Sequence, residues 1–102
     1  MGIEAVWRDE NRNELGRVGD PHMLLSRVAE GSLDLDGTVC LQFLDAYGDA
    51  CFNQFQIPLL ARELAAAAEK CSDIETREHL LAVADLAKRA RGIHTYLWFI
   101  GD

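Results

Sequence analysis

Residues 57–100, IPLLARELAAAAEKCSDIETREHLLAVADLAKRARGIHTYLWFI, carry the strongest secondary-structure signals of the chain. Apolar residues recur at helical spacing through most of this stretch, and an almost unbroken apolar run ends it. The stretch therefore predicts two helices followed by a strand, and the rest of the chain is read outward from it.

Turn and capping residues mark where these two helices begin and end. Pro58 suits the first helical turn, and the apolar side of the first helix comprises Leu59, Leu60, Leu64, Ala67, Ala68 and Cys71. The residues Ser72 to Glu75 match a capping box, with Ser72 as the N-cap. The stripe of the second helix comprises Leu80, Val83, Ala84, Ala87 and Ala90, and Arg91-Gly92 ends it.

The C-terminal segment 94–100, HTYLWFI, is apolar at both alternating sets of positions. A strand that is apolar on both sides usually lies inside a sheet and is covered on both faces. We therefore expect this strand to be central, with Trp98 in the core.

Upstream, the segments 39–44 and 50–57 predict a β-hairpin with Tyr47-Gly48 at its tip. In the second strand the amide side chains of Asn53, Gln54 and Gln56 alternate with apolar residues. Two interpretations remain open: the amides bond to loop backbone, or the aromatic and amide groups form a recognition surface.

The N-terminal part predicts two short strands and a helix. Alternation over residues 3–7 and an apolar segment at 15–18 flank a polar turn at 9–13, and Asp20-Pro21 then begins a helix that ends at Gly31. The predicted order is β-β-α-β-β-α-α-β. This order predicts one two-layer α+β domain over residues 1–102, with three helices on a mixed, mainly antiparallel sheet.

The net charge of −7 is concentrated in one third of the chain. Residues 1–27 hold five acids and four bases, and residues 62–102 hold seven acids and six bases, so each part is −1. Residues 28–61 hold five acids and no Lys or Arg, which gives −5. Such a surface repels nucleic acid and favours a cationic protein partner.

The sequence carries no recognisable catalytic motif. The serines lack a GxSxG setting, the glycines lack a phosphate-binding pattern, and DLDG at 34–37 lacks the other ligands of a calcium loop. The three cysteines are unclustered, which predicts buried, free and inert thiols. We expect no enzyme activity, no cofactor and no metal.

The N-terminus has no apolar signal segment, and no apolar run approaches the ~20 residues of a membrane span. These features predict a soluble, cytoplasmic protein that does not act at a membrane.

Two blocks support a family resemblance: FLDxYGDxxFNQxQIPxLxxEL, residues 43–64, and HTYLWFIGD, residues 94–102. With them the chain resembles small acidic bacterial proteins, some of which are similar to immunity proteins of polymorphic toxin and contact-dependent inhibition systems. The resemblance implies a cytoplasmic protein that binds and neutralises one cognate toxin domain, often a basic nuclease. It implies no site residues.

The charge map suggests the same kind of partner, since a negative patch speeds encounter with a cationic protein. Our leading hypothesis is a stoichiometric inhibitor whose contact surface comprises Asp34, Asp36, Asp45, Tyr47 and Asp49. One rival hypothesis is a homo-oligomeric structural or regulatory domain, for example a homodimer in which the hairpin pairs with the hairpin of a second copy. Another is a small-molecule binder or enzyme with a pocket lined by His79, His94 or the cysteines.

Overall fold

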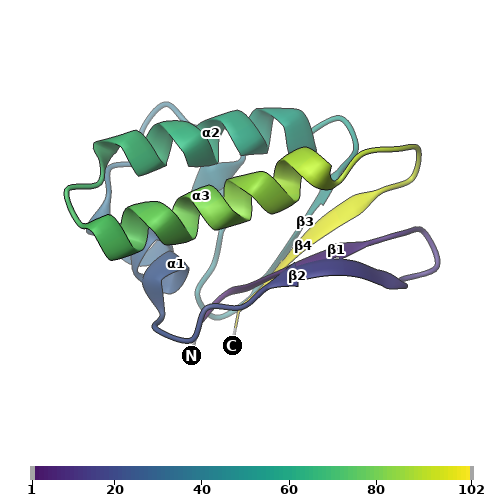
Figure 1. Ribbon diagram of the computed structural model, residues 1–102, viewed down its shortest axis with the longest axis horizontal. Helices are drawn as coiled ribbons and strands as arrows, with labels where there is room; N and C mark the ends of the chain where they lie inside the picture. The colour runs from purple at the N-terminus through teal and green to yellow at the C-terminus, as the bar shows by residue number, and fades with distance from the viewer. Residues whose placement is uncertain (1, 102) are drawn as a thin grey trace.

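The computed structural model describes residues 2–101, which form a four-stranded sheet with helices packed on one of its faces (Figure 1). The elements in chain order are β1 Glu4–Arg8, β2 Glu14–Val18, α1 Leu24–Arg27, β3 Asp49–Asn53, α2 Ile57–Lys70, α3 Ile74–Arg89 and β4 Tyr96–Ile100. A π-type turn, η1 (Val28–Ser32), extends α1, and a 3-10 helix, η2 (Leu41–Phe43), precedes β3. The predicted two-layer α+β fold class is confirmed.

The sheet has the order β2-β1-β4-β3, and all its neighbouring strands are antiparallel. The C-terminal strand β4 lies between β1 and β3, so that Val6 and Cys51 both stand opposite Trp98. The prediction that the C-terminal strand is internal to the sheet is confirmed.

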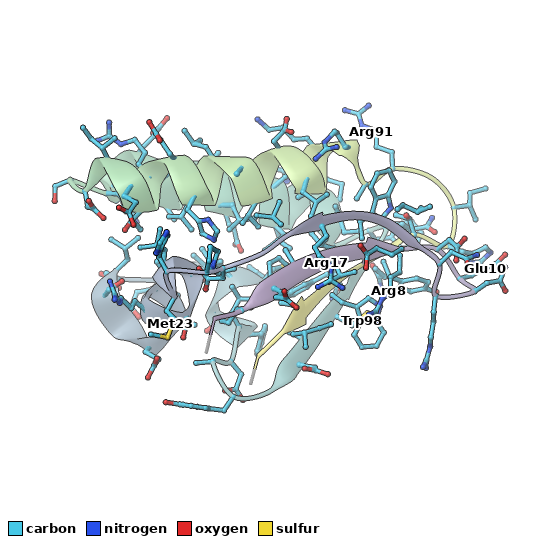
Figure 2. All side chains as sticks on the ribbon, turned by 60° about the horizontal axis from the view of Figure 1, so that its bottom comes forward. Arg8, Glu10, Arg17, Met23, Arg91 and Trp98 are labelled. Carbon is cyan, nitrogen blue, oxygen red and sulfur yellow. The ribbon has the colours of Figure 1, made fainter. Side chains whose placement is uncertain are left out.

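The two faces of the sheet differ, because helices cover only one of them. Phe52, Leu97 and Phe99 are buried on the covered face, and the rings of Phe52 and Phe99 meet edge to face with centroids 5.7 Å apart. Trp98 points to the other face and is only partly buried, with the Arg8 guanidinium 5.6 Å from its ring centroid (Figure 2). The expectation that Trp98 is a core residue is wrong.

The predicted hairpin does not form. Its first strand is replaced by η2, and β3 pairs with β4 instead. Cys40, Leu41 and Leu44 are the buried residues of this segment, and their i, i+1, i+4 spacing is that of a helical turn. The backbone N–H groups of Val39, Cys40 and Leu41 bond to the Glu63 carboxylate on α2, so they are not available to a neighbouring strand.

The second predicted strand is shorter than expected, since β3 ends at Asn53. The Asn53 side chain accepts hydrogen bonds from the backbone N–H groups of Phe55 and Gln56 at 2.9 and 3.1 Å, which turns the chain into α2. The Gln54 side chain accepts from His94 N–H at 2.6 Å. Of the two interpretations of these amides, bonding to loop backbone is the one observed.

The residues that were predicted to begin and end the helices act at the helix ends, but some helices begin at other positions than predicted. Asp20 does bond to free N–H groups, but α1 begins at Leu24 rather than at Pro21. Gly31, at φ 109°, has the left-handed conformation expected where that helical segment ends. The N-cap of α3 is Asp73, which accepts from Thr76 N–H at 3.2 Å, and not Ser72.

Within residues 2–101, no helix is long and apolar enough to cross a membrane.

Candidate functional site

The predicted contact residues belong to one continuous stretch, residues 34–49, here called the acidic segment. It carries Asp34, Asp36, Asp45 and Asp49 and contains no Lys or Arg. All four aspartates are exposed, and no ion pair within residues 2–101 involves them. Their negative charge is therefore presented to solvent without a neighbouring cation.

The first part of the acidic segment is a tight turn. The Asp34 carboxylate accepts from Asp36 N–H at 2.9 Å, and the Thr38 hydroxyl donates to the Leu35 carbonyl at 2.7 Å. Gly37 sits at φ 89°, where an L side chain would be strained. Asp34 thus shapes the turn, while Asp36 is free to contact a partner.

The middle of the acidic segment is fastened to α2 by Glu63. Its carboxylate accepts the backbone N–H groups of Val39, Cys40 and Leu41 at 2.6, 2.9 and 2.9 Å. Burial opposes ionisation of Glu63, but the three hydrogen bonds together outweigh it and hold the pKa of Glu63 below its usual value. Glu63 therefore positions the acidic segment as a carboxylate.

This anchoring turns apolar side chains outward. Cys40, Leu41 and Leu44 face the core, whereas Val39 and Phe43 are exposed, Phe43 to 66% of its surface. Phe43 was expected in a strand over residues 39–44, and its exposure was not predicted. The spacing of the buried residues 40, 41 and 44 fits a helical turn, but the alternation of residues 39, 41 and 43 fits a strand equally well, so no local signal could have found it.

The last part of the acidic segment is the turn over residues 45–48, followed by Asp49. Asp45 accepts from Tyr47 N–H at 2.9 Å, Ala46 is buried, and Tyr47 is 75% exposed. Gly101 N–H donates to the Gly48 carbonyl at 2.8 Å, which ties this turn to the chain beyond β4. The exposed Tyr47 therefore lies in a turn that is fixed by two hydrogen bonds, one to the Asp45 side chain and one from Gly101.

Asp45 and Tyr47 lie in one turn and Asp49 begins β3 directly after it, so the three residues are neighbours although the hairpin predicted around them does not form. Asp34 and Asp36 lie in a different turn, and no hydrogen bond or ion pair of the described residues joins the two turns. The five predicted residues are thus one segment of chain but two local structures.

Groups with catalytic or ligand-binding potential have structural partners instead. Asp20 is buried and accepts four backbone N–H groups, those of Ile3, Leu24, Leu25 and Ser26. His79 Nε2 lies 3.3 Å from Asp20 Oδ1 and makes no hydrogen bond to the described residues. Because Asp20 already ties the start of β1 to α1 through its four hydrogen bonds, we assign Asp20 to the fold.

The cysteines are free, as expected, but they are not all buried. Cys40 and Cys71 are buried, whereas Cys51 is exposed on β3. The expectation of three buried thiols is wrong for Cys51, because β3 is an edge strand and Cys51 faces the uncovered side of the sheet. Among residues 2–101, no three His, Cys, Asp or Glu side chains gather as a metal site would require.

The cations of the uncovered sheet face are already engaged. Arg17 contacts Glu4 at 2.7 Å and Glu14 at 2.8 Å, which raises the pKa of Arg17, and Arg8 stacks near Trp98. The cations of this face are therefore matched by nearby acids or an aromatic ring, whereas the carboxylates of the acidic segment have no neighbouring cation.

Comparison with protein-family models, with curated proteins and with solved structures finds no match.

Proposed function

We propose that this protein is a stoichiometric inhibitor of the immunity type, which binds and neutralises a basic toxin or nuclease domain through the acidic segment. The observation that carries the proposal is the coincidence, on one anchored segment, of unpaired carboxylates with the exposed aromatic side chains of Phe43 and Tyr47.

Both components have a physical role in such a complex. Unpaired carboxylates steer a cationic protein toward the surface and raise the association rate. Large aromatic side chains supply buried apolar area at the centre of an interface, where most of the binding energy resides. Asp36, Asp45 and Asp49 would serve the first role, and Phe43 and Tyr47 the second.

The anchoring of the segment matters as much as its chemistry. A loop that is ordered only on binding loses affinity to the entropy of ordering. Here Glu63 and the Gly48–Gly101 hydrogen bond hold the segment in place beforehand. Function then consists of binding, without catalysis, a cofactor, nucleic acid or a membrane, and the compartment we propose is the cytoplasm.

The test begins with a search for the partner. The full chain serves as bait in an extract of the native host, beside a triple variant with Asp45→Asn, Tyr47→Ala and Asp49→Asn. A matched control removes the same kinds of group elsewhere, by Glu10→Gln, Glu69→Gln and Leu15→Ala, all of which are exposed.

We expect the chain and the control to capture the same basic protein, and the triple variant to lose it. The chain should also abolish the toxicity or nuclease activity of that protein at equimolar ratio. Capture by the triple variant as efficient as by the chain would refute the proposed surface. A separate Asp34→Asn, Asp36→Asn variant tells whether the first turn belongs to the same interface.

A further inference from the structure

α3 exposes an apolar and acidic stripe on its outer side. Ile74, Glu78, Leu81 and Asp85 follow the i, i+4, i+7, i+11 spacing that places residues on one helix face. Ile74 is 66% exposed and Leu81 is 44% exposed, so two large aliphatic side chains lie in solvent and alternate with two acids along the stripe. Nothing in the proposed inhibitor surface accounts for them.

A groove of about 720 Å³ lies between α2 and the C-terminal end of α3. Alanines form much of its lining, including Ala61 and Ala65 from α2, and their small side chains let another helix approach closely. Its charged side chains are the cations Arg62, Lys88 and Arg91 and one acid, Glu69, so the groove is net positive. No ion pair within residues 2–101 uses any of these three cations, and Figure 2 shows Arg91 beyond the end of α3, apart from Arg8 and Arg17 on the sheet.

We propose that a second copy of this chain occupies the groove, in a two-fold dimer formed by the α2–α3 layer. When two α3 helices cross antiparallel midway between Leu81 and Asp85, Glu78 of each copy faces Lys88 of the other, and the N-terminal half of each lies against the C-terminal half of the other. The stripe of one copy then enters the alanine-lined groove of its partner, and the symmetry repeats this contact.

Charge and exposure favour a second copy over an unrelated partner. The first half of α3 carries Glu75, Arg77 and Glu78, net −1, and the second half carries Asp85, Lys88 and Arg89, net +1. Arg89 is paired with Asp85 at 3.2 Å, so Lys88 is the cation of this half without an ion pair among the described residues. The two halves complement each other only in the antiparallel orientation. An unrelated acidic helix would fill the groove but would leave Ile74 and Leu81 in solvent. A second copy accounts for both features.

This dimer leaves the acidic segment accessible. Glu63, which holds the acidic segment, lies on the opposite flank of α2 from Ala65, which lines the groove. The inference therefore does not depend on the proposed inhibitor function, and it predicts a bivalent molecule if that function holds.

The test is sedimentation velocity of the full chain and of charge variants across a wide concentration range at low salt. We expect the chain to dimerise, and Glu78→Lys or Lys88→Glu each to weaken the dimer about tenfold or more, because each creates two like-charge contacts across the axis. Glu10→Lys makes the same charge change in the β1–β2 turn and should leave the dimer unchanged.

The decisive experiment is to mix the Glu78→Lys and Lys88→Glu variants and to measure whether they dimerise with each other. In a mixed dimer, the lysine introduced by Glu78→Lys in one chain faces the glutamate introduced by Lys88→Glu in the other. The second contact keeps its natural residues, so the mixture should dimerise again. Circular dichroism confirms that each variant is folded. A monomeric chain at every concentration, equal weakening by Glu10→Lys, or no recovery on mixing would overturn the inference.

Discussion

The substitution Glu63→Gln should loosen the acidic segment and lower the stability of the whole fold. The carboxylate of Glu63 accepts three backbone N–H groups at 2.6–2.9 Å, while Gln keeps the shape, loses the charge and turns an NH₂ group toward these donors. A hydrogen bond to a charged group contributes about 1.5–3 kcal/mol and a neutral one about 0.5–1.5 kcal/mol. The loss is therefore about 1 kcal/mol per bond.

Summed over the three bonds, the free energy of unfolding should fall by about 2–3 kcal/mol, because water reaches the exposed Val39 and compensates part of the loss. For a chain of this size the melting temperature should fall by about 10–20 °C. The assay is urea and thermal unfolding followed by tryptophan fluorescence. Glu69→Gln on the same helix, exposed and without a hydrogen bond to the described residues, is the matched control and should change stability by less than about 0.5 kcal/mol.

The pH dependence of the stability loss caused by Glu63→Gln is a second, independent test of this prediction. The folded-state pKa of Glu63 is lowered, so its contribution to stability is present above the unfolded value of about 4.5 and is lost as the pH falls through the folded value. The stability difference between the natural chain and Glu63→Gln should therefore shrink below about pH 4.5. A difference near zero at neutral pH, or one that does not change on acidification, would refute the reasoning.

Two further predictions follow from the two faces of the sheet. Leu97→Ala opens a cavity in the core and should lower the free energy of unfolding, measured with urea, by about 2–5 kcal/mol. Trp98→Ala on the uncovered face should lower it by less than about 2 kcal/mol, and equal losses would contradict the assignment of faces. A thiol reagent should modify Cys51 rapidly in the native protein and the buried Cys40 and Cys71 only on unfolding, although burial raises the pKa of all three thiols; three equally fast thiols would contradict the structure.

The sequence predicts the elements that carry strong local periodicity. The stripes of α2 and α3, the terminating Gly92 at φ 117° and the apolar run of β4 are all recovered in the structure. Over 14 and 16 residues, the helical period is repeated often enough to exclude a strand.

Residues 39–57 are too short for periodicity to decide. Cys40, Leu41 and Leu44 fit a helical turn, but Val39, Leu41 and Phe43 fit a strand equally well by alternation. The structure is decided by a distant partner, the Glu63 carboxylate, which no local pattern reveals. For the same reason the sequence could indicate the acidity of the candidate surface but could not predict the exposure of Phe43.

The predicted contact residues also have a different local structure from the one expected. Asp45, Tyr47 and Asp49 were expected at the tip of a hairpin; they are neighbours in the chain at the start of β3, but the hairpin itself does not form. Whether Asp34 and Asp36 share the interface depends on the partner and not on the fold.

Stopped-flow measurement of the rate at which the purified chain associates with the protein it captures, at low and moderate salt, decides whether the acidic segment is the binding surface. Salt should slow the association of the chain and of the Glu10, Glu69, Leu15 control alike. The Asp45, Tyr47, Asp49 triple variant should associate more slowly, with a weaker salt dependence, and should dissociate at least about thirtyfold faster, as expected for an anchor worth about 2 kcal/mol. Rates of the triple variant equal to those of the control at both salt concentrations would contradict the claim that the acidic segment is the binding surface.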